Sequence, residues 1–184
     1  LGVLGQRHLS VPKYGPSVAS PGYPFEPRSN AHLLAGQFWG LPLSDGRWAC
    51  GRVLAVSTRD DAYFPGNSRT FMAGLMNWEG DIPPTSEALA GCTLLAQGWA
   101  HVRAIQENGR EVLGQRDLDL DGIRGLEQVT HRGGGTVMVY EGARPIREAT
   151  REEAATMPLL SGWGVRFIST LAERAFVERL PIVQ

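Results

Sequence analysis

The sequence contains little lysine, little cysteine and no long apolar run. Lys13 is the only lysine among 18 basic residues, a bias that we attribute to codon usage and that excludes no function. The formal net charge of −1 gives no overall field that would concentrate nucleic acid or an anionic membrane surface. No stretch approaches the roughly 18 uninterrupted apolar residues that a membrane span requires. We therefore expect no membrane association, and a charged partner must meet a local patch.

The two cysteines, Cys50 and Cys92, exclude the commoner cysteine-based sites. They form no CxxC pair and no histidine stands at ligand spacing from either, so no zinc site is predicted. Residues 1–30 lack the basic start and apolar block of a secretory signal. We expect a cytoplasmic protein whose cysteines are buried free thiols, as suits the reducing cytosol.

Residues 1–30 are expected to form a proline-rich arm. They contain five prolines among glycine and serine, which favours extended, irregular backbone. Such an arm packs against its own domain or against a neighbouring copy, so a homo-oligomer formed through the arm is one alternative. Residues 31–184 are long enough for a single domain with its own core.

An aromatic hairpin is predicted in 37-QFWGLPLSDGRWACGRVL-54. Asp45-Gly46 is a strong signal for a two-residue turn, because both residues tolerate positive φ. This turn sets Trp39 opposite Arg52 and collects six apolar side chains on one core face: Trp39, Leu41, Leu43, Trp48, Cys50 and Leu54. The other face carries small residues, so that a backbone, a helix or a ligand can approach it closely.

Further strands and two helices complete an α+β fold. Strands are predicted near 69–78 and at 136–141, and a second hairpin over 99–118 has Asn108-Gly109 as its turn. Thr150 and Glu153 form a capping box for a short helix that ends at Pro158, and helical spacing predicts a longer helix over about 165–180. We predict a curved antiparallel sheet, with barrel-like closure left open, and C-terminal helices packed on it.

The motif 117-DLDLDG-122 concentrates negative charge. It matches the first half of an EF-hand loop, but position twelve is Gln128 and a strand is expected before it, so no metal site is predicted. On an extended backbone Asp117, Asp119 and Asp121 share one side. Such a stripe is either a solvated strand edge or a patch that faces a cationic surface, for example the substrate groove of a nuclease.

Catalytic motifs are absent from the sequence. The glycines in 131-HRGGGTVMVYEG-142 precede a strand and lack the Gly-Lys-Ser/Thr ending of a phosphate loop, so they predict a flexible loop. The four histidines are scattered and there is no G-x-S-x-G elbow. His131 beside Arg132 is the one pair suited to acid-base work on RNA. We predict no catalytic residue, no metal and no cofactor.

The pattern 36-GQFWGLPLSDGRWACGRVLAV-56 resembles the immunity protein 26 family of bacterial polymorphic toxin systems. The resemblance covers about residues 34–120, and 161-SGWG-164 is compatible with it. It implies a non-enzymatic protein that binds a cognate toxin inside the producing cell and blocks it, with no nucleic acid as partner. The expected partner-binding residues are acidic or lie in the turn after the strand near 69–78: Asp117, Asp119, Asp121, Trp78, Glu79 and Asp81.

A second resemblance supports a different function. A strand that opens with glycine and an aromatic residue and a later strand that reads "GRVLAVS" are similar to the start of the small β-barrel ribonucleases of the MazF type. That resemblance implies RNA cleavage by basic and acid-base groups, for which only Arg52, Arg69, His101 or Arg103 are suitable here. A non-catalytic protein-interaction module is the third alternative.

Overall fold

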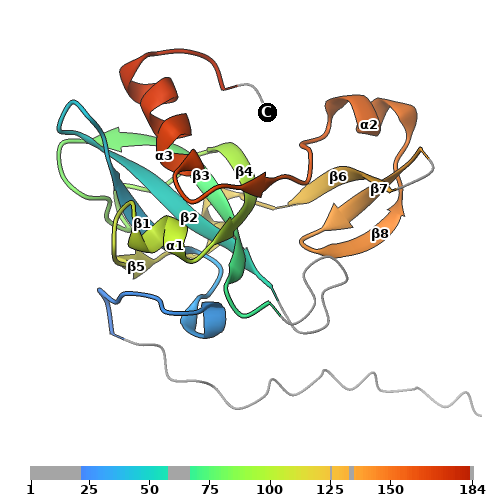
Figure 1. Cartoon of the computed structure of the whole chain (residues 1–184). Helices are drawn as coiled ribbons and strands as arrows, with labels where there is room; N and C mark the ends of the chain where they lie inside the picture. The colour runs from blue at the N-terminus through green and yellow to red at the C-terminus, as the bar shows by residue number, and fades with distance from the viewer. Residues whose placement is uncertain (1–21, 58–66, 125, 133–134, 183–184) are drawn as a thin grey trace, which may run out of the picture.

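The computed structural model describes residues 22–57, 67–124, 126–132 and 135–182, which form two sheets and several short helices (Figure 1). The main sheet has six strands in the order β5-β1-β2-β3-β4-β9, and a smaller sheet has the order β6-β7-β8. The predicted α+β class is confirmed, and no closed barrel is formed, because β5 and β9 are edges of the main sheet in the part of the chain described. None of the described helices is long and apolar enough to cross a membrane.

The main sheet is mixed rather than purely antiparallel. Its strands are β1 (Gln37–Pro42), β2 (Trp48–Val56), β3 (Thr70–Gly80), β4 (Leu94–His101), β5 (Gly114–Gln115) and β9 (Gly162–Trp163). β4 and β9 run parallel, and the other neighbours run antiparallel. The strand expected near 69–78 is therefore confirmed as β3.

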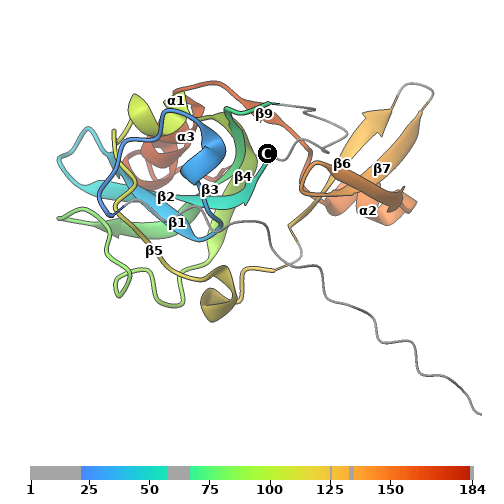
Figure 2. The same ribbon diagram turned by 90° about the horizontal axis from the view of Figure 1, so that it is seen from below.

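A small lobe is formed by β6 (Glu127–Arg132), β7 (Thr136–Glu141), β8 (Arg144–Glu148) and α2 (Arg151–Thr156). In two perpendicular views it lies to one side of the main sheet (Figures 1 and 2). The predicted capping box is confirmed: the Thr150 hydroxyl accepts from the Glu153 N–H at 3.2 Å, and the Glu153 carboxylate accepts from the Thr150 N–H at 2.8 Å. The strand predicted at 136–141 is confirmed as β7.

The first hairpin is present, but its predicted register is wrong by one residue. Trp39 lies opposite Gly51, not Arg52, and Arg52 lies opposite Phe38. The loop holds three residues, 44–46, because the Leu43 N–H donates to the Arg47 carbonyl and Gly46 takes the left-handed φ of 89° that this loop type requires. Trp39 consequently covers Gly51, whose Cβ, if present, would lie 2.3 Å from the indole. This side chain fills the space expected beside Gly51, whereas the backbone at Gly109 approaches Gly40 closely, as expected for the small-residue face.

The second predicted hairpin is wrong. After β4 the chain forms a short helix, α1 (Arg103–Gln106), and Asn108-Gly109 terminates that helix instead of closing a hairpin. The N–H groups of Gly109 and Arg110 both donate to the Ile105 carbonyl. An Asn-Gly pair is common at a helix end as well as in a hairpin turn, because asparagine and glycine both tolerate positive φ.

The C-terminal helix is shorter than the predicted 165–180. It consists of α3 (Phe167–Ala172) and a π-helical turn (Glu173–Val177). The chain ends this helix at Arg179, which has a φ of 57°, and Pro181 follows. As predicted, an apolar stripe covers the main sheet, since Ile168, Leu171 and Phe176 belong to the same buried cluster as residues of β1 and β3.

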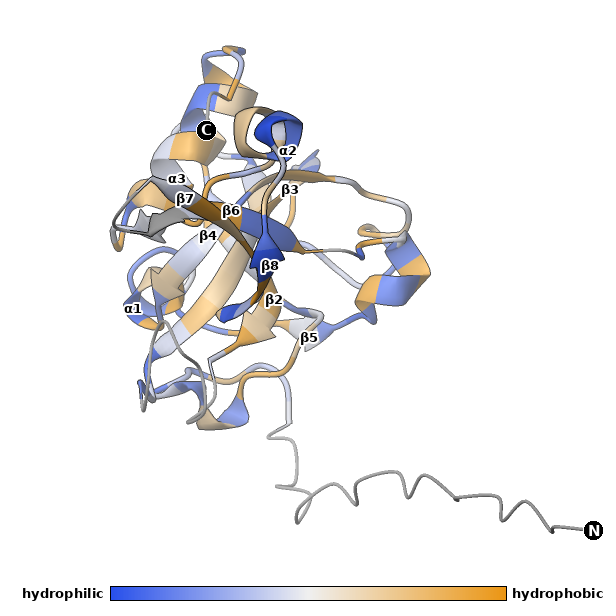
Figure 3. Ribbon diagram, turned by 90° about the vertical axis from the view of Figure 1, so that its right-hand side faces the viewer, coloured by the Kyte–Doolittle hydropathy of each residue, from blue (hydrophilic) through white to orange (hydrophobic). Residues whose placement is uncertain are grey.

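Two apolar clusters lie on the two faces of the main sheet. The first packs β1 and β3 against α3, and Trp39 meets Phe71 edge to face with ring centroids 5.8 Å apart. The second joins the other face to the small lobe through Trp99 and Tyr140. Burial on both faces explains why β2 is predominantly hydrophobic, whereas the exposed β8 is predominantly hydrophilic (Figure 3).

Only part of the predicted arm lies in the described residues. Phe25 pairs with Val112 through two backbone hydrogen bonds, and Asn30, in a 3₁₀ helix (η1, Asn30–His32), is buried. Residues 1–21 lie outside the described residues, so association through the arm stays a prediction.

Candidate functional site

A cleft of about 610 Å³ lies where the main sheet meets the small lobe. Its apolar lining includes Trp99, Ile123 and Leu126, and its charged lining consists of Asp117, Asp119, Glu141 and Arg124. Three carboxylates against one guanidinium give the lining a formal charge of −2. We call this site the acidic cleft.

The acidic turn that lines the cleft is helical, so the predicted extended stripe is wrong. Residues Leu118–Asp121 form a 3₁₀ helix (η2), and the Asp117 side chain caps it by accepting from the Asp119 N–H at 3.0 Å. Gly122 ends the turn with a φ of 67°. Alternation of aspartate and leucine is typical of a strand. However, an aspartate side chain that accepts a hydrogen bond from the backbone two residues later stabilises a turn in place of the strand.

Asp121 lies inside the protein and takes no part in the acidic cleft. Its side chain is fully buried, and it accepts from Arg52 at 2.7 Å, from Arg116 at 2.9 Å and from the Gly91 N–H at 3.0 Å. Burial alone would raise the pKa of Asp121, but these three donors outweigh burial and hold the pKa below the ordinary 3.8. Asp121 therefore cannot contact a partner, contrary to the prediction of an exposed carboxylate.

Arg52 fixes the shape of the acidic turn. Besides its ion pair with Asp121, it donates to the carbonyl oxygens of Arg116 at 2.6 Å and Asp117 at 3.2 Å. It is fully buried, so it is not accessible to RNA as the ribonuclease hypothesis requires. It holds the segment that presents Asp117 and Asp119.

The carboxylates of the cleft differ in their pairing. Asp119 accepts from Arg124 at 2.8 Å, but both side chains are more than 60% exposed, so this ion pair is weak. Asp117 and Glu141 are exposed and have no ion pair in the described residues. Glu141 was missed by sequence reasoning, because only the placement of β7 brings it beside the acidic turn.

Trp78 and Glu79 lie in a different place from the acidic turn. They line a groove of about 730 Å³ together with the C-terminal residues Phe176, Arg179 and Leu180. Asp81 is exposed in the loop after β3 and lines neither this groove nor the acidic cleft. The structure thus does not bring the six predicted partner-binding residues together.

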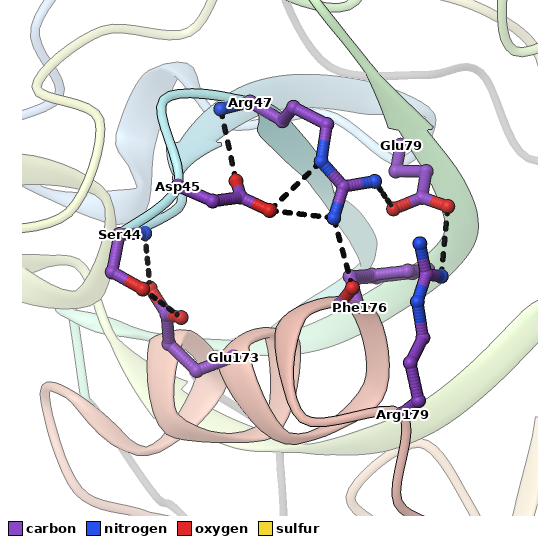
Figure 4. A network of polar contacts seen from close by, with 7 residues as sticks. All are labelled: Ser44, Asp45, Arg47, Glu79, Glu173, Phe176 and Arg179. Atoms are coloured by element: carbon purple, nitrogen blue, oxygen red, sulfur yellow. Dashed lines mark hydrogen bonds and ion pairs between the residues drawn. The ribbon is translucent and has the colours of Figure 1, made fainter.

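Glu79 takes part in a network that ties the first hairpin to the C-terminal helix (Figure 4). Arg179 donates to Glu79 at 2.9 Å, and Arg47 pairs with the other oxygen of Glu79. At the far end of the network, the Ser44 N–H and hydroxyl donate to Glu173 at 2.7 and 2.8 Å. The Glu79 carboxylate is therefore already paired with two arginines of its own chain.

Three of the four groups suggested for RNA cleavage form a basic surface cluster: Arg69, His101 and Arg103. The Arg103 N–H donates to His101 Nδ1 at 3.1 Å. His101 pairs in the sheet with Thr70, the residue that follows Arg69. Burial, Arg69 and Arg103 lower the pKa of His101, so the ring is neutral at pH 7. No carboxylate bonds to His101 within the described residues. The side chains of His131 and Arg132 lie outside those described.

The two cysteines are free thiols, but only one is fully buried. Burial raises the pKa of the Cys50 thiol far above the ordinary 9.0, whereas Cys92 is partly exposed and its pKa is raised chiefly by partial burial. In the residues that the structure describes, no group of three or more histidine, cysteine, aspartate or glutamate side chains could hold a metal ion.

Comparisons of this chain with models of protein families, with curated proteins and with solved structures found no match.

Proposed function

We propose that this protein is an immunity-type protein of the cytoplasm that binds a cognate bacterial toxin at the acidic cleft and blocks it by occlusion. The observation that carries the proposal is the combination of an apolar lining with Asp117, Asp119 and Glu141. A basic segment of a toxin, such as the substrate groove of a nuclease, complements both features. The resemblance of residues 36–56 to the immunity protein 26 family points to the same function.

The charge of the cleft favours fast association. Exposed carboxylates on one face steer a basic partner during diffusional encounter, an effect that weakens as salt rises. Partly exposed apolar groups in the lining, such as Leu118 and Leu126, then supply a surface that excludes water on contact. A contact of roughly 800 Å² per partner is sufficient for tight inhibition without turnover.

The cleft is also held in shape before binding. Arg52 bonds to two backbone carbonyls of the acidic turn and to Asp121, so that the turn is ordered in the free protein. A binding surface that is already ordered loses less conformational entropy on association. This favours recognition by a rigid surface over enclosure of a partner by flexible loops.

The test uses the product of a toxin gene encoded beside the gene for this chain. Binding of the purified toxin domain is measured by surface plasmon resonance with the chain and with the triple variant Asp117→Asn, Asp119→Asn, Glu141→Gln. We expect the triple variant to associate at least about tenfold more slowly at low salt. The matched control neutralises three exposed carboxylates that do not line the cleft, Glu87, Glu111 and Glu148, so that it has the same net charge as the triple variant. It should associate at least about tenfold faster than the triple variant at low salt.

An unchanged association rate for the triple variant would exclude the acidic cleft as the binding site. A chain that fails to bind or inhibit the toxin would exclude the immunity function itself.

A ribonuclease remains the second candidate, because Arg69, His101 and Arg103 lie together on the surface. Incubation of the purified chain with labelled RNA tests it directly. Metal-independent cleavage that Arg69→Ala or His101→Ala abolishes would support this candidate and contradict a binding-only protein. Intact RNA after prolonged incubation would remove the ribonuclease from consideration.

A further inference from the structure

A separate cleft of about 560 Å³ is lined by two exposed arginines, Arg110 and Arg166. Its lining includes Pro42, Trp48, Asn108, Arg110 and Arg166. The side chains of Arg110 and Arg166 make no hydrogen bond or ion pair in the described part of the chain, whereas Glu107 at the same cleft is bonded to Arg103. We call this site the arginine cleft. Two unpaired guanidinium groups at one cavity of this size suit a small anion.

Arg110 occupies a backbone conformation that disfavours a side chain. Its φ is 69°, at a helix end where glycine or asparagine is the usual residue. The preceding Gly109 cannot be exchanged with it, because a Cβ on residue 109 would lie 2.0 Å from the Gly40 carbonyl oxygen. Residues in strained backbone conformations are concentrated at functional sites, and Arg110 lines a cavity.

Asn108 holds the two arginine-bearing segments together. Its Nδ2 donates to the Ala104 carbonyl at 2.6 Å and to the Val165 carbonyl at 2.8 Å, and its Oδ1 accepts from the Ser169 hydroxyl at 2.6 Å. The residue two before Arg110 is thus bonded to the residue directly before Arg166. Both guanidinium groups are therefore mounted on backbone that is fixed in the free protein.

Trp48 supplies a flat aromatic surface in the same cleft. It is half-buried, and its benzene ring lies against Gly40, where a Cβ would be only 2.9 Å from the ring. This contact restricts the indole, so it can serve as a stacking platform without a large loss of side-chain entropy. Indoles stack on nucleobases in a way that tolerates the identity of the base.

We propose that the arginine cleft binds a nucleoside monophosphate, with the phosphate between Arg110 and Arg166 and the base against Trp48. Guanidinium groups bind phosphate through paired hydrogen bonds, and the cavity volume lies within the range of small-molecule sites. This binding is independent of the acidic cleft, which has no lining residue in common with it.

The proposal is tested by calorimetric titration of the full chain with adenosine 5′-monophosphate and uridine 5′-monophosphate at low salt. We expect saturable binding of both nucleotides. Inorganic phosphate, which lacks the base, and adenosine, which lacks the phosphate, should each bind at least about tenfold more weakly. Arg110→Gly removes the guanidinium and relieves the strained φ. It should lose at least about tenfold in nucleotide affinity while its melting temperature stays the same or rises.

Two further variants complete the test. Trp48→Phe should weaken nucleotide binding and leave phosphate binding unchanged. Arg151→Ala removes an exposed arginine outside the cleft and should bind both nucleotides as the unaltered chain does. The proposal is overturned if neither nucleotide binds saturably, if phosphate binds as tightly as the nucleotides, or if Arg110→Gly retains full affinity.

Discussion

At the scale of single residues, the pair of Arg52 and Asp121 is the most consequential contact in the protein. Both side chains are fully buried, and together with Arg116 and the Gly91 N–H they satisfy most of each other's hydrogen-bonding groups. Transfer of such charges out of water is unfavourable, so the pair contributes less to net stability than its short distance suggests. Removal of one partner, however, leaves a buried charge uncompensated.

Asp121→Asn should therefore destabilise the protein by about 3 to 5 kcal/mol, because Arg52 keeps its charge without a counterion. Urea unfolding followed by tryptophan fluorescence measures the change. Asp119→Asn is the control, since its ion pair with Arg124 is exposed, and it should change stability by less than about 0.5 kcal/mol. Equal effects of the two substitutions would show that the buried pair has no special role.

The same pair predicts how stability depends on pH. The pKa of Asp121 is lower in the folded protein than the ordinary 3.8, so its contribution is fully present above that value and is lost as pH falls through the lowered pKa. The stability difference between the unaltered chain and Asp121→Asn should stay constant between about pH 5 and 7 and shrink below about pH 3.8. A difference that shrinks between pH 7 and 5 would contradict the lowered pKa.

The cysteines should differ in reactivity. Burial raises the pKa of both thiols, but Cys50 is fully buried whereas Cys92 is partly exposed, so the Cys50 thiolate is both scarce and inaccessible. A thiol reagent at pH 8 should modify Cys92 slowly and leave Cys50 unmodified until urea unfolds the protein. Mass spectrometry after tryptic digestion distinguishes the two sites, and Cys92→Ser should show no modification in the folded state.

At the scale of secondary structure, strands with apolar residues of high β propensity could be predicted, whereas their connections could not. β3 and β7 follow from their composition, and α2 follows from the capping box. Asp45-Gly46 fits a loop of two residues or of three, and the pairing differs by one residue between them. Only packing decides this, because the three-residue loop places Arg52 on the face where Asp121 lies.

The candidate site, too, could be predicted only where it depends on local sequence and not on packing. The charges of Asp117 and Asp119 are evident in the sequence, but the capping of η2 and the inward turn of Asp121 depend on Arg52, which is far away along the chain. The contribution of Glu141 depends on the position of the small lobe. Local sequence therefore indicated the acidic residues, but neither their helical conformation nor the residues that complete the cleft.

The end of α1 offers a test at this scale. Gly109→Ala should destabilise the protein by about 2 to 3 kcal/mol, because the new Cβ would overlap the Gly40 carbonyl oxygen and neither backbone segment can move freely. Gly162→Ala, where no atom lies within 4 Å of the added Cβ, should have little effect. Thermal unfolding of both variants gives the comparison, and a mild effect of Gly109→Ala would show that α1 is loosely packed on β1.

At the scale of the whole molecule, Gln128 lies at the junction of the two sheets. It is fully buried on the face of β6 shared with Tyr140, and neither end of its amide has a hydrogen-bond partner in the described residues. Gln97, also buried, differs because it donates to the Glu127 carbonyl at 3.4 Å. A buried amide without partners opposes the docking of the small lobe.

Gln128→Leu should therefore stabilise the protein by about 1 kcal/mol, since it replaces an unsatisfied amide by an apolar group of similar volume. Gln97→Leu, in which the Glu127 carbonyl loses a donor, should instead destabilise it. Urea unfolding measures both. A loss of stability in Gln128→Leu would indicate that the amide of Gln128 is satisfied in solution.

The chain enters and leaves the small lobe at neighbouring positions. Val129, near the entry, pairs with Leu159, near the exit, and the Val129 N–H donates to the Pro158 carbonyl. After Leu159 the chain continues to β9. Residues beyond that junction form an excursion whose length has no bearing on the strand order of the main sheet. Changes in the length or sequence of this excursion would leave the strand order of the main sheet intact. One side of the acidic cleft, the side that carries Glu141, could thus be rebuilt by design without a change in the main sheet.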